Sequence, residues 1–230
     1  MLRKLSAAAI AAAFACPASA MATTWDAFDL FDGSNPTGVF RYVGFTGPIG
    51  QNPSLMATDD CPLDTTCLRA NPGDSGFFKA GADTPATIEV DDGSILTVPT
   101  GALIVQPGDF GAAVFFNAPH AGTYRIKAVF NGAETLNDGV TIASLQSLAP
   151  SVILGTANTT PNNLVYDGRV TLGENQFFAF FVGPGLAAEH DLTSLSFRVI
   201  EGVPEPGAWA LMIMGFGGVG AALRRRAVPA

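Results

Sequence analysis

Residues Ala112–Phe130 read AAVFFNAPHAGTYRIKAVF, two apolar segments joined by a turn that contains proline and glycine. In the second segment, Thr123–Phe130, every second residue is apolar, and Arg125 and Lys127 lie between apolar positions. Side chains point alternately to the two faces of a strand, so this period of two indicates a strand with one face in a core and the other in water. The sequence here therefore predicts two strands, Ala112–Phe116 and Thr123–Phe130.

Short apolar segments bounded by turn residues recur on both sides of these strands, and no segment keeps a helical apolar period. They predict further strands at Val39–Phe45, Thr87–Val90, Ile95–Val98, Leu103–Val105, Val140–Ser147, Leu164–Leu172, Gln176–Val182 and Leu195–Ile200. Phe177–Phe181 is apolar on both faces, which is typical of a central strand covered on both sides. Gln51–Gly76 and Ala149–Asn163 are predicted as loops, and Asn131-Gly132 as the end of a strand. The pattern indicates an all-β sandwich or barrel.

The front end of the 230-residue chain has the features of an export signal. Residues 1–20 combine a basic start, an alanine-rich apolar run and a small-residue site. This pattern predicts a signal-peptide helix that is cleaved after Ala18-Ser19-Ala20. A lipoprotein with Cys16 lipidated is the alternative, and Pro17 directly after the cysteine disfavours it.

The back end contains an apolar run, Ala208–Leu223, followed by Arg224, Arg225 and Arg226. As a helix this run spans roughly 24 Å, which is short against about 30 Å of hydrocarbon. It predicts one short transmembrane helix whose arginines reach the headgroups and hold residues 227–230 in the cytoplasm.

Pro204, Glu205 and Pro206 stand directly before this run, and Trp209 lies at its start. Tripeptide, apolar run, arginine cluster and terminal position together resemble the PEP-CTERM sorting signal of Gram-negative bacteria, here over residues 204–226. The resemblance implies that an exosortase, a membrane enzyme, cuts near the tripeptide and passes the protein to the cell surface or extracellular matrix. We therefore expect export through the Sec machinery and a precursor held transiently in the inner membrane. The alternative is a plain anchor without processing.

The segment between the two signals, residues 21–203, is long enough for one domain with a real core. Five of the 12 basic residues and one of the 20 acidic residues lie in the terminal signals, so this domain contains 19 acidic and 7 basic residues. This excess of negative charge argues against nucleic acid as a partner, because its phosphates must be neutralised.

Cys61 and Cys67 are the two cysteines of the exported domain. An exported pair is expected to form a disulfide in an oxidising compartment. Two cysteines without a nearby histidine make a poor metal site, so the disulfide is the prediction.

A second resemblance rests on several short motifs in one order. They are Val105-Gln-Pro-Gly, the turn and strand Ala118–Ile126, Asn137-Asp-Gly-Val, Phe180–Gly185 and Leu195-Ser-Phe-Arg-Val. These motifs resemble the jelly-roll sandwich of carbohydrate-binding-module-like domains in secreted bacterial proteins, and the likeness covers about Val98–Ile200. It implies a jelly-roll-type β-sandwich.

Candidate chemical clusters are sparse. His120 and His190 are the only histidines, and Glu189-His190-Asp191 is predicted to lie in a solvated loop. Aspartates cluster at Asp59-Asp60, at Asp91-Asp92 and within 26–32; turn formation is the expected role, and a structural calcium is the alternative. We expect no other cofactor and no metal site.

Five aromatic residues offer a further alternative, a stacking platform for sugars. They are Trp25, Phe28, Phe31, Tyr42 and Tyr166. The chain is rich in phenylalanine, so most of its aromatic residues are expected in the core.

These observations predict a non-enzymatic role at the cell surface or in the extracellular matrix. The sequence contains no nucleophile elbow, no zinc-protease motif and no phosphate-binding glycine loop, so no catalytic residue is predicted. The alternative role is a carbohydrate-binding module for exopolysaccharide. A secreted hydrolase has no residues that favour it.

Overall fold

The structure is a computed structural model that describes residues 22–47, 51–58, 61, 65–70, 75–81, 85–89, 95–133, 139–147, 149–157, 163–185, 191–202 and 216. The predicted signal peptide with Ala18 and Ala20 lies outside these residues. The same holds for Pro204, Glu205, Pro206, Trp209, Arg224, Arg225 and Arg226, and for the predicted transmembrane helix apart from Phe216. Among the described residues, no helix combines the length and hydropathy that crossing a bilayer requires.

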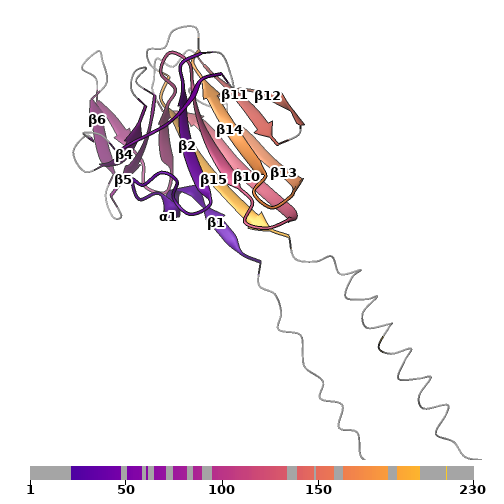
Figure 1. Cartoon of the computed structure of the whole chain (residues 1–230). Coiled ribbons are helices and arrows are strands. Elements are labelled where there is room, and N and C mark those ends of the chain that lie inside the picture. Colours follow the sequence, from indigo (N-terminus) through magenta and orange to yellow (C-terminus); the bar gives the residue numbers. More distant parts are fainter. Residues whose placement is uncertain are drawn as a thin grey trace, which may run out of the picture.

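The chain forms two antiparallel sheets that enclose one core (Figure 1). Sheet A runs in the order β13 (Leu164–Leu172), β10 (Gly122–Gly132), β15 (Thr193–Glu201), β8 (Leu103–Gln106), β5 (Gly76–Ala80) and β4 (Thr65–Arg69), and β1 (Thr24–Asp26) also pairs with β15. Sheet B runs in the order β12 (Ala149–Ala157), β11 (Val140–Gln146), β14 (Phe177–Gly183), β9 (Ala112–Asn117), β2 (Phe40–Phe45) and β3 (Pro53–Leu55). A single helical turn, α1 (Ala27–Leu30), follows β1.

The second half of the chain alternates between the two sheets. β9 belongs to sheet B, β10 to sheet A, β11 and β12 to sheet B, β13 to sheet A, β14 to sheet B and β15 to sheet A. Each crossing brings the next strand beside a partner far away in sequence. The molecule is therefore all-β, a jelly-roll-type β-sandwich.

The core between the sheets is built largely from aromatic rings. Phe180 of β14 lies with its ring centroid 5.2 Å from that of Phe130 and 5.1 Å from that of Phe197, both of sheet A. Tyr42 is fully buried, and its hydroxyl donates to the carbonyl oxygen of Ala27 at 3.4 Å. Burial raises the pKa of Tyr42 above its ordinary value. Edge-to-face aromatic pairs of this kind add to the free energy gained by burying the rings.

The outer face of sheet A is covered over only half of its width. A hairpin of β6 (Ala86–Glu89) and β7 (Ile95–Val98) packs there, with Leu96 and Val98 buried against Phe78 of β5 and Ile104 of β8. In Figure 1 β6 lies beside β4 and β5, away from β10, β13 and β15. The outer side of these last three strands is exposed.

Cys61 and Cys67 form a disulfide with a Cα–Cα distance of 5.5 Å, which confirms the predicted bond. Cys67 lies on β4, and its side chain is buried with the hairpin cluster. The bond therefore strengthens the covered half of sheet A.

Most predicted strands are confirmed, with ends shifted by one or two residues, and β14 is a central, buried strand as expected. Three expectations were wrong. Ala149–Asn163 is not a loop, since β12 occupies Ala149–Ala157 at the edge of sheet B. Val152 and Ile153 stay exposed there, so the strand has no buried alternation that the sequence could display.

The other two errors have a common cause. Gln51–Gly76 contains β3 and β4 and the first residue of β5, and Asn131-Gly132 continues β10 instead of ending it. Asn131 and Gly132 pair with Ser194 and Thr193 of β15. β3 and β4 pair with β2 and β5, so in each case pairing with another strand outweighs the turn preference of a short polar segment.

Candidate functional site

Nine exposed or half-buried side chains of β10, β13 and β15 form a patch on the uncovered half of sheet A, here called the open face. The strand register arranges them in three rows, which are Arg169, Arg125 and Ile200, then Asp167, Lys127 and Arg198, then Val165, Val129 and Ser196. Each alternates along its strand with a side chain of the core, such as Tyr124, Ile126 and Ala128 on β10. The alternation that builds the sandwich thus also builds this face.

Charged groups pair diagonally on the open face. Arg125 donates from Nε and from its terminal nitrogen to the two oxygens of Asp167, at 2.8 and 2.7 Å. This bidentate hydrogen bond is the main reason that the pKa of Asp167 is lowered and that of Arg125 is raised. Asp167 is thereby engaged by Arg125, although its partner in register is Lys127.

A shallow hollow of about 320 Å³ lies on the lower two rows of this face. Val129 and Val165 supply apolar surface, and Lys127, Asp167, Ser196 and Arg198 surround it with polar groups. Val165 is 64% exposed, a high value for a valine on a strand. The hollow therefore offers both apolar contact and hydrogen-bonding groups to a ligand.

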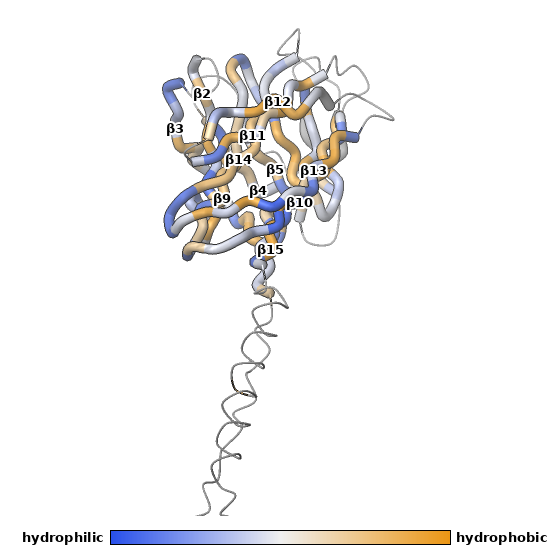
Figure 2. The backbone as a smooth tube through the Cα atoms, turned by 90° about the vertical axis from the view of Figure 1, so that its right-hand side faces the viewer, coloured by the Kyte–Doolittle hydropathy of each residue, from blue (hydrophilic) through white to orange (hydrophobic). Residues whose placement is uncertain are grey.

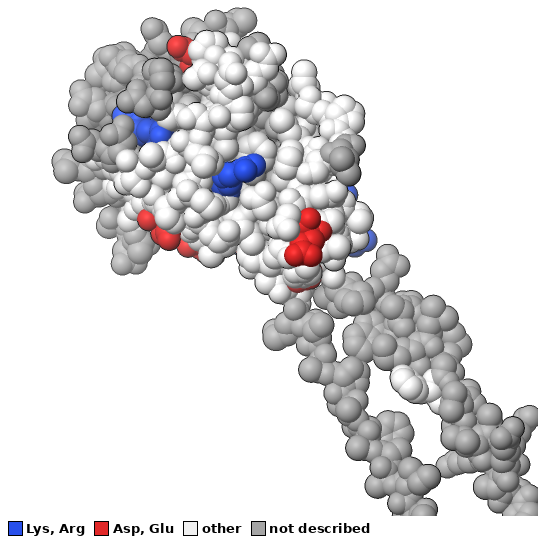
Figure 3. Space-filling view, viewed as in Figure 1, with Lys and Arg blue, Asp and Glu red and all other residues white. Residues whose placement is uncertain are grey.

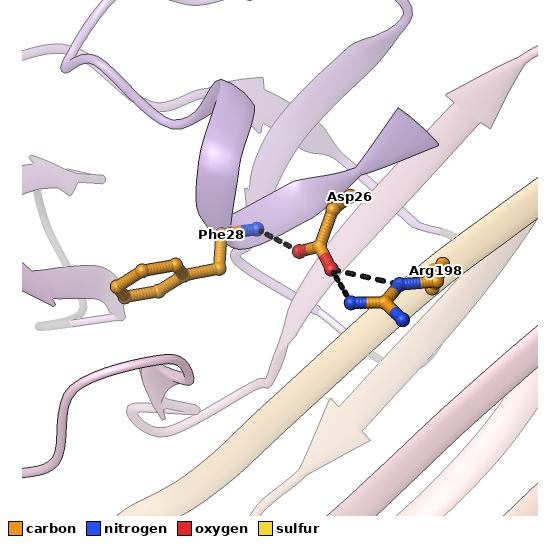
Figure 4. A network of polar contacts seen from close by, with 3 residues as sticks. All are labelled: Asp26, Phe28 and Arg198. Atoms are coloured by element: carbon orange, nitrogen blue, oxygen red, sulfur yellow. Dashed lines mark hydrogen bonds and ion pairs between the residues drawn. The ribbon is translucent and has the colours of Figure 1, made fainter. Parts of the chain in front are cut away.

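Arg198 also contacts the first strand of the domain. Asp26 accepts hydrogen bonds from Arg198 Nε at 3.0 Å and from its terminal nitrogen at 2.8 Å, through one carboxylate oxygen (Figure 4). Its other oxygen accepts from the backbone N–H of Phe28 at 2.9 Å and caps α1. This carboxylate therefore connects β1, α1 and β15.

β1 and β15 lie side by side in register, with Thr24 opposite Ile200 and Asp26 opposite Arg198. The backbone N–H of Glu201 donates to the carbonyl oxygen of Thr23 at 2.9 Å, and that of Gly202 to Thr123 at 2.7 Å. The start and end of the sandwich therefore lie at the same pole, as Figure 1 shows, and Figure 2 shows β15 at this end of the sandwich from another direction.

The outer side of sheet B differs from the open face. Its buried side chains, here called the apolar face, are Val43, Phe45, Ala113, Phe115, Ala143, Ala179 and Phe181. Each of them is at most 8% exposed. Figure 3 shows a side of the molecule on which most of the surface is uncharged and the charged groups stand apart.

The aromatic residues considered as a sugar platform do not form one. Phe31 and Tyr42 are buried, and Trp25 packs against Phe116 and Tyr124 with centroid distances of 5.6 and 6.1 Å. Tyr166 packs against Phe178 and Phe180 inside the sandwich. Phe28 of α1 is half-buried against the same core, with Lys79 Nζ 4.6 Å from its ring centroid, so all five rings belong to the core or lie against it.

The acidic and histidine clusters are also separated. Asp26 binds Arg198. Asp32 accepts hydrogen bonds from the hydroxyl and from the backbone N–H of Ser34, which lower the pKa of Asp32. Within the described ranges, no three histidine, cysteine, aspartate or glutamate side chains gather where a metal ion could bind. Asp59-Asp60 and Asp91-Asp92 lie outside those ranges, so structural calcium stays an untested alternative to turn formation there.

Two residues from the predicted clusters have unexpected partners. Asp191 is buried and accepts the backbone N–H of Gly185 at 2.7 Å, so its placement in a solvated loop was wrong. Glu189 and His190 lie outside the described residues. His120 pairs through Nε2 with Glu201, next to the last residues of the sandwich.

The tail can be compared with a known family. A family model described as the PEP-CTERM protein-sorting motif matches residues 202–226. The tail is a PEP-CTERM sorting motif. It implies an exported precursor that is anchored in the membrane and processed by an exosortase. A search of curated proteins gives no match.

Solved structures similar to the sandwich are carbohydrate-binding modules. The CBM51 of Clostridium perfringens GH95, solved with methyl-galactose, is 7% identical with a TM-score of 0.36, and the match covers 77% of this chain and 99% of that chain. The N-terminal cellulose-binding domain of Cellulomonas fimi β-1,4-glucanase C is 16% identical with a TM-score of 0.30, over 54% and 93% of the two chains. The C-terminal CBM6 of LamC from Zobellia galactanivorans is 14% identical with a TM-score of 0.26, over 60% and 99%.

Sequence reasoning found the tail and the disulfide but not the open face. Arg125 and Lys127 were recognised as outward-facing residues of one strand. The remaining residues of the open face could have been found from the same alternation of side chains in Val165–Arg169 and Ser196–Arg198. Only the register of the three strands brings these segments together.

Proposed function

We propose that this protein is a non-enzymatic binding component of the cell surface or extracellular matrix, displayed as a folded β-sandwich after its tail is processed. The observation that carries the proposal is the position of the sorting motif. It begins at Gly202, directly after the last strand, at the pole where β1 also starts. A sandwich held at this pole leaves the open face accessible along its side.

The sorting step can be tested by intact mass and cell fractionation in the native host. Wild type is compared with a variant in which Pro204, Glu205 and Pro206 are alanines. We expect a shortened wild-type species outside the inner membrane and a full-length variant within it. As a matched control, Val228 and Pro229, which lie beyond the motif, are replaced by alanine and should change nothing. If wild type keeps its full tail and stays in the membrane, the tail is a plain anchor.

The second candidate function is carbohydrate binding, and the hollow on the open face favours it. A sugar ring has apolar C–H faces and a rim of hydroxyl groups, and the hollow combines two valines with four polar side chains. Retention in gels that contain a polysaccharide, lost when Val129 and Val165 are both changed to serine, supports binding there. Release of reducing ends from the same polysaccharides would instead indicate an enzyme.

A further inference from the structure

Basic residues are concentrated on the open face to an unusual degree. The exported domain has only seven basic residues against 19 acidic ones. Four of the seven, Arg125, Lys127, Arg169 and Arg198, share this face within three adjacent strands. Asp167 is its only acidic residue, and Asp26 adjoins it from β1. A strongly acidic protein thus presents a local excess of positive charge.

The register places like charges opposite one another. Arg125 is paired with Arg169 across β10 and β13, and Lys127 with Arg198 across β10 and β15. Like charges directly opposite in a sheet destabilise it, and among the described side chains Asp167 is the one carboxylate that faces Arg125, Lys127 and Arg169, so cations outnumber anions here. An anion bound between them would relieve the repulsion.

The two carboxylates nearby are already used. Asp167 binds Arg125, and Asp26 binds Arg198. Within the part of the chain that the structure describes, neither Lys127 nor Arg169 forms an ion pair or a side-chain hydrogen bond. These two cations stand on either side of the Arg125–Asp167 pair, and Lys127 also borders the hollow.

We propose that the open face binds a carboxylated polysaccharide, with a sugar ring on Val129 and Val165 and its carboxylates at Lys127 and Arg169. This inference rests on the proposed carbohydrate-binding role and names the ligand class. Ser196 at the rim is placed to exchange hydrogen bonds with hydroxyl groups. The contact is charge-assisted and partly solvated, so salt weakens it.

The same charges disfavour nucleic acid as the occupant. The domain as a whole repels a densely charged phosphate backbone, whereas a polysaccharide has more widely spaced charges. The aromatic residue that lines the hollow, Tyr166, packs its ring against Phe178 and Phe180, so it is not a free platform on which a base could stack. DNA is therefore a competing outcome for the test and not the proposal.

The experiment uses the full chain, purified in a non-ionic detergent, so that it does not depend on sorting. Binding to polygalacturonate is compared with binding to the same polymer after methyl esterification, which removes the charge and keeps the sugar backbone. We expect polygalacturonate to bind at least about tenfold more tightly than the esterified polymer, because esterification removes about one charge-assisted contact.

The decisive variant is Lys127→Gln with Arg169→Gln, and its matched control is Ser54→Glu with Thr87→Glu. Both change the net charge by the same amount, but Ser54 and Thr87 are exposed on β3 and β6, away from the open face. We expect the first variant to lose about tenfold or more in affinity and the control to lose little, with unchanged melting temperatures.

Four results would overturn the inference. The first three are equal loss in both variants, which indicates net charge alone; equal binding to the esterified polymer, which leaves a neutral-sugar module; and tighter binding to double-stranded DNA. Absence of any binding by wild type would also end it, while the fractionation result for the sorting tail would stand unaffected.

Discussion

The outer sides of the two sheets differ in the composition and the exposure of their side chains. On sheet A, the outward positions of β10, β13 and β15 include five charged side chains and are exposed or half-buried, whereas on sheet B most outward positions of β2, β9, β11 and β14 are apolar and many are buried. The inner sides of both sheets face the same core, so the two sheets differ only on their outer sides. An exposed outer side leaves room for binding groups, and a buried one makes the strand part of the structural support.

Replacing Phe181 by alanine should have the largest effect. Phe181 is 2% exposed on the apolar face, with its ring centroid 5.4 Å from that of Phe45. We expect a loss of about 3 kcal/mol in the free energy of unfolding, measured in urea, because the ring leaves a cavity. Arg125→Ala on the open face is the control, and its urea midpoint should hardly move. Equal losses would mean that the two faces do not differ in this way.

Gly111→Ala tests the packing of the apolar face by adding a Cβ atom to a backbone position next to Phe181. Gly111 has a φ of +101°, and a Cβ there would meet the ring of Phe181 and come within 2.9 Å of the carbonyl oxygen of Val182. The strained backbone and the overlap should lower the free energy of unfolding by about 2 kcal/mol. Gly101→Ala is a suitable comparison, because its φ is also positive and no atom lies within 4 Å of its added Cβ. If the two variants were equally stable, the packing around Phe181 would be looser than described.

Removing the disulfide tests how much this bond stabilises the covered half of sheet A. Changing Cys61 and Cys67 together to serine opens a small loop and should lower the free energy of unfolding by about 2 kcal/mol. Reduction of wild type should lower its melting temperature similarly and leave the double variant unchanged. Two free thiols in the oxidised protein from the native host would contradict the bond.

Acid should have the smallest effect, and it should act on the open face. The hydrogen bond from Arg125 holds the pKa of Asp167 below its unfolded value, so the stabilisation is present above pH about 4. It is lost as the pH falls through the lowered pKa. Asp167→Asn should therefore be slightly less stable than wild type at pH 7, and the two should be equal near pH 2. Chemical denaturation at both pH values measures this; a constant difference would exclude Asp167 as the cause.

Sequence reasoning was most successful where the signal is local. Leu164–Leu172 was predicted with both of its ends, and the cysteine spacing was enough for the disulfide. The buried pattern of Phe177–Phe181 even indicated which strand has two covered sides.

Sequence reasoning failed where a strand shows no local alternation, and where pairing between distant segments determines the structure. β12 is an edge strand with exposed Val152 and Ile153, so no alternation marks it. The rows of the open face join residues of β10 to residues of β15 about 70 positions later, and no local pattern contains that register. The platform of aromatic rings, an alternative to the expected core placement, does not form, and the five rings lie in the core or pack against it.

The pairing of β1 with β15 also governs the order in which this domain can assemble. Thr24 and Ile200 are neighbours in the sheet although almost the whole domain separates them in the chain. In a chain that is exported N-terminus first, β1 crosses the membrane early and must wait for β15, the last strand to emerge. Closure of the pole therefore coincides with arrival of the apolar tail at the bilayer. A truncated or stalled chain cannot pair β1 with β15. Only a completely translocated molecule therefore has this strand pair formed beside its sorting motif.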